Sequence, residues 1–188
     1  MYEFSFYKNG EWVYVVVDDQ IPCNRGKPIF ARCQDITEVW VMLIEKAYAK
    51  LHKCYENLEG GSETFALVDM TGGAPEEIKF DDKEGAAIVN SNKLWPKVIK
   101  YSGLGYLLGC AMLVPNATAE ADAGKGILMN HAYGIIDGKE VNGAKLLRVR
   151  NPWGQGEWKG AWSDGSKEWT PQLLAKLNYK FEDDGTFW

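Results

Sequence analysis

The stretch that decides the fold is residues 131–154, HAYGIIDGKEVNGAKLLRVRNPWG, because its pattern predicts one antiparallel hairpin. Residues 132–136 and 145–150 are rich in the β-branched and apolar side chains that are typical of paired strands. Two turn signals lie between them, Asp137-Gly138 and Asn142-Gly143.

Folding this stretch about residue 141 places His131 directly opposite Asn151 at the open end of the hairpin. Directly opposed residues share a face, with Cβ atoms about 4.5–5.5 Å apart, and a slip of one residue would put them on opposite faces. An asparagine oxygen at that distance can accept the imidazole N–H and leave the other ring nitrogen as a general base. The pair is two-thirds of a thiol-protease site. A structural histidine beside a turn-capping asparagine gives the same pattern.

The composition is that of a folded, mildly acidic chain. Its 188 residues, 46% of them hydrophobic, allow one domain or two small ones. A net charge of −5 argues against nucleic acid or an anionic membrane as a partner. The sequence contains no run of about 18 apolar residues, and the start Met1-Tyr2-Glu3-Phe4 has no basic region. We therefore expect no integral membrane segment, no signal peptide and a cytoplasmic location.

The spacing of the cysteines and histidines argues against a zinc site or a disulfide scaffold, because CxxC motifs are absent. Reduced thiols in a cytosolic protein are the simplest interpretation. The residues concerned are Cys23, Cys33, Cys54, Cys110, His52 and His131.

The first half of the chain predicts a hairpin followed by a long helix. The hairpin joins residues 4–7 to 12–17 through an Asn-Gly turn. The helix spans about residues 37–58, where apolar side chains recur with a period of 3.6. We expect Asp35 as its N-cap, Glu38 at the capping-box position and His52 on its solvated face.

The second half predicts shorter elements. Residues 71–75 form a loop and a candidate boundary. A short helix over 94–101 must hold Pro96 in its first turn. The apolar run 107–114 predicts a buried strand, and residues 115–130 predict a mobile loop that leads to His131.

Several short motifs together resemble the protease core of the calpain family, and they occur in the family's order along nearly the whole chain. They are GEWV (10–13) with VVVDD (15–19), LIEKAYAKL (43–51), TGG (71–73), LLGC (107–110), HAY (131–133), RVRNPWG (148–154), EW (157–158), GAWSD (160–164) and DGTFW (184–188).

The resemblance implies an α+β fold of the papain-like cysteine proteinase type. A partial helical lobe over residues 1–73 would be followed by a β-rich antiparallel lobe over residues 74–188, truncated at its C-terminus. The family's nucleophilic cysteine and oxyanion-hole glutamine lie upstream of the position of Met1. The cysteines present here lack the tryptophan that follows the family's nucleophile; Cys23, for example, precedes Asn24.

Carried over by motif, His131 would be the general base and Asn151 its orienting residue. Trp153 would shield their hydrogen bond from water; plain core packing is the alternative, and both can hold. Met129-Asn130 stands where the family usually has Lys-Gly. The implied substrates are proteins or peptides, and the implied partner is the rest of the parent protease core.

Calcium is the cofactor that the resemblance implies. In the second lobe the matching carboxylates are those of Glu157, Asp164 and Asp184, with a backbone carbonyl near Glu182. Thr186 stands where the family usually has glutamate, which should weaken or abolish this site. A solvated acidic surface is the alternative. Glu38 matches a first-lobe ligand, but its partners would lie upstream.

The leading hypothesis is therefore a part of a calcium-dependent cysteine endopeptidase that works through an acyl-enzyme. The chain alone should be inactive, since it lacks the nucleophile. The alternative is a non-catalytic, calpain-like interaction or regulatory module. This alternative is favoured by Thr186 and by the stretch 65–70, which differs from the family's usual sequence. An upstream Gly-x-Cys-Trp run would favour the enzyme, and serine or glycine at the cysteine would favour the module.

Overall fold

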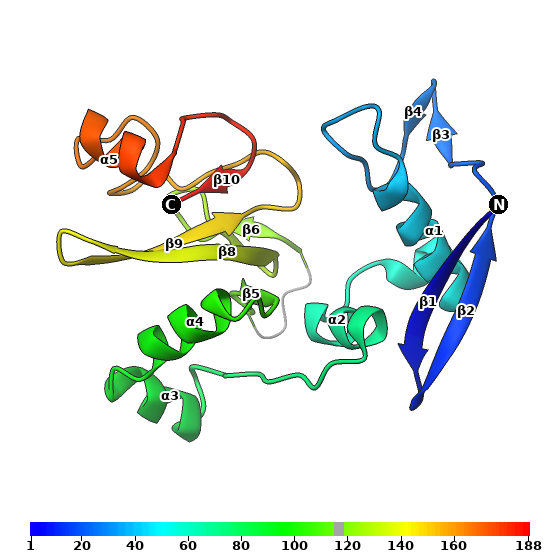
Figure 1. The fold of residues 1–188 in the computed structure, drawn as a ribbon, viewed down its shortest axis with the longest axis horizontal. Helices are drawn as coiled ribbons and strands as arrows, with labels where there is room; N and C mark the ends of the chain where they lie inside the picture. The colour runs from blue at the N-terminus through cyan, green and yellow to red at the C-terminus, as the bar shows by residue number, and fades with distance from the viewer. Residues whose placement is uncertain (115–118) are drawn as a thin grey trace. The chain divides into compact units, whose positions relative to one another are not determined.

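The computed structural model describes residues 1–114 and 119–188, and contacts divide the chain into two compact units, residues 1–77 and 78–188 (Figure 1). A helical first part precedes an antiparallel, β-rich second part, which confirms the α+β class. The lobe boundary expected after Gly73 stays a prediction. No helix among the described residues is both long and apolar enough to cross a membrane.

The first unit is built on the predicted Asn-Gly hairpin. Strand β1 (Tyr2–Lys8) pairs with β2 (Glu11–Val17) from Tyr2↔Val17 to Lys8↔Glu11. Asn9 and Gly10 both have positive φ, 54° and 92°, as a type I′ turn requires. Alternation along the strands places Phe6, Val15 and Val17 on one face, where they pack on helix α1 (Trp40–Leu51) around Ala47.

Helix α1 is shorter than the predicted helix over residues 37–58. Asp35 does not cap it, because its carboxylate accepts hydrogen bonds from the backbone and hydroxyl of Thr37 in a local turn. Glu38 does not complete a capping box either; its carboxylate accepts the indole N–H of Trp40. At the other end, Lys53 adopts φ 87° and ends the α-helix. The remainder becomes the 3₁₀ helix η1 (Tyr55–Leu58).

Helix α2 (Glu63–Thr71) was not predicted, because its apolar side chains do not gather along one stripe. It has clear end signals nevertheless. The hydroxyl of Ser62 accepts the N–H of Thr64, and Gly72 ends the helix in the left-handed region at φ 68°. Strands β3 (Cys23–Asn24) and β4 (Lys27–Pro28) complete the unit.

The second unit contains a four-stranded antiparallel sheet in the order β10-β9-β8-β5. Helix α4 lies against one face, where Gly138 leaves room for Ile99. Helix α5 lies on the other side of the sheet from α4 (Figure 1). There Val141 and Leu146 join an aromatic cluster that packs against leucines of α5. The elements are α3 (Lys83–Asn90), α4 (Leu94–Gly103), β5 (Leu108–Ala111), β6 (Ala121–Asp122), β7 (Leu128–Met129), β8 (Ala132–Val141), β9 (Ala144–Arg150), α5 (Pro171–Leu177) and β10 (Thr186–Phe187).

The helix over 94–101 is confirmed, with Pro96 in its first turn. The buried strand over 107–114 is wrong: β5 is a short strand with a neighbour on one side only, and Leu107 and Leu113 are exposed by 62% and 75%. In the predicted mobile loop, residues 115–118 lie outside the described residues. The β6–β7 hairpin occupies most of the remainder.

Candidate active site

The long β8–β9 hairpin positions the site, but its register differs from the prediction. Val141 pairs with Ala144 around the two-residue turn Asn142-Gly143, whose φ angles are 50° and 80°. Further along, an extra residue at Ile136 shifts the pairing by one. Folding about residue 141 had predicted that His131 lies directly opposite Asn151, and this register is wrong. The residue opposite Asn151 in the extended ladder is Tyr133.

The bulge is what brings the two side chains together. Without it, the ladder that starts at the turn would place His131 and Asn151 on opposite faces of the hairpin. With it, they become diagonal neighbours on one face, a separation that long side chains bridge. His131 Nε2 lies 2.8 Å from Asn151 Oδ1. The predicted contact is present although the predicted register is wrong.

The amide of Asn151 has a fixed orientation. Its Nδ2 donates to the carbonyl of Gln155 at 2.8 Å, and its Oδ1 also accepts the backbone N–H of Trp153 at 3.1 Å. Oδ1 therefore faces the ring as an acceptor, and Nε2 of His131 must carry a proton to donate to it. The bond is buried, since Asn151 is 1% exposed and His131 6%.

Trp153 lies beside this bond, with its ring centroid 5.0 Å from that of His131 in an edge-on contact. The ring of Tyr133 makes a second edge-on contact with the imidazole, at 4.9 Å between centroids. Trp153 itself is 55% exposed, so it covers the pair on one side without being part of a buried core. Its shielding role stays a prediction.

Glu120 is a neighbour of His131 that the sequence did not predict. Its Oε1 lies 2.7 Å from Nδ1 of His131, the ring nitrogen that Asn151 leaves free. Nothing in the sequence marks Glu120, because it lies eleven positions before His131 in a segment of small polar residues. Asn130 helps to hold this segment: its amide donates to the carbonyl of Ala119 and accepts the N–H of Val114.

The structure describes all four cysteines. None of them lies at the start of an α-helix, where the dipole would favour a thiolate. Cys110, in β5 of the same unit as His131, does not face a free imidazole nitrogen, because Asn151 and Glu120 engage both.

The acidic residues matched to calcium ligands are engaged by the protein itself. Glu157 Oε1 accepts the backbone N–H groups of Asp184 and Gly185 at 3.2 and 3.1 Å. Asp164 Oδ1 accepts the phenol of Tyr179 at 2.5 Å. Burial, followed by the negative charge of Asp164, raises the pKa of Glu157 above its usual range.

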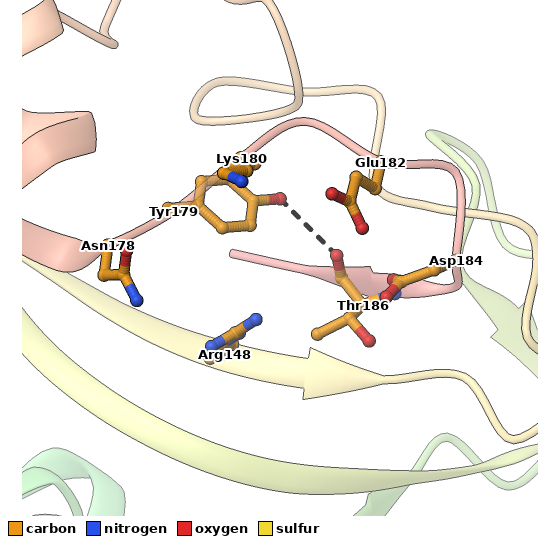
Figure 2. Close-up of a pocket in the computed structure, with 7 residues that line it drawn as sticks. All are labelled: Arg148, Asn178, Tyr179, Lys180, Glu182, Asp184 and Thr186. Carbon is orange, nitrogen blue, oxygen red and sulfur yellow. Dashed lines mark hydrogen bonds between the residues drawn. The ribbon is translucent and has the colours of Figure 1, made fainter. Parts of the chain in front are cut away.

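A pocket of about 260 Å³ beside these acids has mixed charge, as Figure 2 shows. Its lining residues are Arg148, Asn178, Tyr179, Lys180, Glu182, Asp184 and Thr186. Cations inside such a pocket oppose a bound metal ion. In the part of the chain that the structure describes, no three His, Cys, Asp or Glu side chains are arranged to hold one. As they stand, these second-lobe residues do not fit calcium. Glu38 is exposed and bonded to Trp40.

Comparison with known proteins identifies the class. The family model described as "Calpain family cysteine protease" matches residues 1–188. Over its full length the chain is 43% identical to the calpain-type cysteine protease DEK1 of Arabidopsis thaliana and 42% identical to the calpain-1 catalytic subunit of Gallus gallus. It covers 9% and 27% of these two relatives. The chain belongs to the calpain family of cysteine proteases.

Proposed function

We propose that this chain supplies the general base and its orienting residue to a calpain-type cysteine endopeptidase. The single observation that carries the proposal is the buried 2.8 Å bond from His131 Nε2 to Asn151 Oδ1, with the amide fixed by its own partners. This bond holds one nitrogen protonated and leaves Nδ1 to exchange a proton with a thiol. The thiol itself would come from a first-lobe segment outside residues 1–188.

In the assembled core, Nδ1 of His131 takes the proton of the cysteine thiol, and the thiolate attacks the carbonyl carbon of the peptide bond. The C–N bond then breaks as Nδ1 returns the proton to the leaving amine, which produces an acyl-enzyme. Water attacks the acyl-enzyme with the same nitrogen as general base, and this step releases the acid and regenerates the thiol. Asn151 fixes the ring plane throughout, and Glu120 must withdraw from Nδ1 before the cycle starts.

The proposal extends to protein or peptide substrates, a cytoplasmic location and calcium dependence of the whole protease core. These come from the family rather than from a contact in the structure. Within this chain, Glu38 would need calcium ligands from elsewhere, and the second-lobe acids contribute little because Asp164 and Glu157 each have one carboxylate oxygen engaged by the protein.

A fusion tests the proposal. The chain alone, incubated with a fluorogenic peptide and calcium, should show no thiol-sensitive hydrolysis. Fused behind the cysteine-bearing segment of the calpain-1 catalytic subunit of Gallus gallus, it should hydrolyse the peptide, and iodoacetamide should block the reaction. Thiol-sensitive cleavage by the chain alone, or fusion activity that survives His131→Ala, would contradict the proposal.

The alternative is a non-catalytic, calpain-like interaction or regulatory module. The observation that favours it is Glu120, whose carboxylate takes the nitrogen that a thiol would need. A fusion that unfolds in one cooperative transition yet hydrolyses no peptide, even as the Glu120→Ala variant, would support this alternative.

A further inference from the structure

Tyr179 lies at the centre of the second-lobe acidic residues. Its phenol donates to Asp164 Oδ1 at 2.5 Å and lies 3.4 Å from the carbonyl oxygen of Thr186. The side chain is 5% exposed, within the aromatic cluster that includes Trp169 and Trp188. The hydroxyl has one proton, and the much shorter contact assigns it to Asp164, so the Tyr179 side chain joins the loop that contains Asp164 to the 179–186 stretch.

The hydrogen bond from Tyr179 to Asp164 is short and lies among buried aromatic side chains. A phenol that donates to a carboxylate makes a charge-assisted hydrogen bond, which is stronger than a bond between neutral groups.

One carboxylate oxygen of Asp184 and the carbonyl of Glu182 have local partners too. Asp184 Oδ1 accepts the N–H of Thr186 at 2.7 Å, and the carbonyl of Glu182 accepts the N–H of Asp184 at 2.8 Å. Since calcium takes 6–8 oxygen ligands, a cation would have to break several of these bonds at once.

Positively charged side chains are a further reason why these residues do not fit calcium. Arg150 Nη1 donates to the hydroxyl of Thr186 at 2.9 Å, at the position where the family usually has a carboxylate. The guanidinium of Arg148 lies 5.7 Å from the ring centroid of Tyr179 (Figure 2). Fixed cations at these positions provide charge that a metal ion would otherwise supply.

We propose that the Tyr179 phenol replaces calcium in this lobe, as a metal-free latch between Asp164 and the 179–186 stretch that leads into strand β10. A bound ion would bridge the same two segments, through a carboxylate on one and the 182–186 stretch on the other. The phenol makes that bridge with a hydrogen bond. The inference rests on the proposed function only in taking calcium as the ion to test.

The first measurement is the thermal unfolding of the 188-residue chain in EGTA, in CaCl₂ and, as a control for ionic strength, in MgCl₂. The latch predicts the same midpoint in all three solutions and no heat of calcium binding by titration calorimetry. Neither readout involves catalysis, so failure of the latch and failure of the protease proposal are separate results.

Two variants test the latch directly. Tyr179→Phe removes only the hydroxyl and should lower the midpoint by roughly 4–8 °C, equally in EGTA and calcium. Tyr14→Phe, at a side chain that is 67% exposed, is the matched control and should leave it unchanged. Asp164→Asn keeps an oxygen acceptor and should lower the midpoint by less than Tyr179→Phe does.

Two results would overturn the latch. One is a calcium-specific rise in the midpoint that Asp164→Asn removes, because Asp164 would then be a ligand. The other is a Tyr179→Phe midpoint as high as that of Tyr14→Phe. If Tyr179→Phe does not fold, the comparison of the parent chain with Asp164→Asn still tests the latch. A calcium-specific rise in the midpoint that only the parent chain shows contradicts the latch, and no rise in either protein supports it.

Discussion

The chain's two histidines both contact carboxylates, yet their surroundings differ. His131 is 6% exposed, and its two nitrogens lie against Asn151 and Glu120. His52, the C-cap of α1, has a side chain that is 27% exposed, and its Nε2 lies 3.3 Å from Asp69 Oδ2. The prediction of a solvated helix residue was wrong for His52.

The difference lies in what else the acceptor holds. Asp69 Oδ2 is shared with the ammonium of Lys8 at 2.5 Å and the phenol of Tyr48 at 3.0 Å, so it serves as a common anchor for β1, α1 and α2. Asn151 Oδ1 is neutral and aimed by a fixed amide, so it orients the ring of His131 without adding charge. A buried carboxylate with three donors stabilises a fold, whereas an oriented amide positions one proton.

The largest effect should separate the two histidines by activity. In the fusion with a cysteine-bearing first lobe, His131→Ala should lower kcat/KM by at least about 10³-fold, because the thiol loses its base. His52→Ala should leave kcat/KM unchanged and lower only the thermal midpoint. Comparable losses of activity in the two variants would remove the distinction.

The next effect should appear in stability. Asp69→Asn leaves the Lys8 ammonium without its anion and should cost about 2–3 kcal/mol of unfolding free energy at pH 7, measured by urea denaturation. Although burial raises it, the hydrogen bonds from Lys8 and Tyr48 hold the pKa of Asp69 below its usual range. At pH values above the ordinary pKa of an aspartate, the ionised carboxylate therefore stabilises the fold. This stabilisation is lost as the pH falls through the lowered pKa that Asp69 has in the folded state.

The cost of Asp69→Asn should accordingly shrink when the same denaturation is repeated near pH 3. A cost that is equal at the two pH values would show that the charge of Asp69 is not what matters. Asp19→Asn, at an exposed residue, is the matched control and should change little at either pH.

A smaller effect is expected at the orienting amide. Asn151→Ala leaves the buried Nε2–H of His131 and the carbonyl of Gln155 without partners. We expect a loss of about tenfold in kcat/KM of the fusion, equivalent to about 1.4 kcal/mol. Asn151→Asp should recover part of it, because a carboxylate can accept the same proton. Full activity in Asn151→Ala would show that the ring needs no orienting residue.

The sequence predicted the contact between His131 and Asn151 correctly, but it did not predict the strand register that produces this contact. His131 and Asn151 were paired correctly because side-chain parity in a hairpin depends only on even offsets, and the observed offset of two is even. The bulge at Ile136 could not be predicted, since it depends on how the whole sheet twists and packs. The same limit applies to Tyr179 and Asp164, which lie 15 positions apart and meet through tertiary packing.

Local competition explains the errors in the helices. Asp35 is of a residue type that favours helix N-caps, but it forms a local turn with Thr37 instead. Lys53 is of a residue type that is common inside helices, but its left-handed backbone ends α1. Glu120 had no signal at all, because a carboxylate in a polar loop has no periodicity that indicates where it points.

The smallest effect concerns Nδ1 of His131, which contacts Glu120 in the structure and which a thiol would need during catalysis. Glu120→Ala removes the acceptor at Nδ1 of His131, a hydrogen bond worth about 0.5–1.5 kcal/mol, so modification of His131 by diethyl pyrocarbonate should accelerate roughly 2–12-fold. His52, in the same sample, is the internal reference and should react at an unchanged rate. Glu140→Ala, at an exposed carboxylate on β8, is the matched control. If His131 reacts equally fast in the parent chain and in Glu120→Ala, Nδ1 is already accessible, and the carboxylate does not restrain the base.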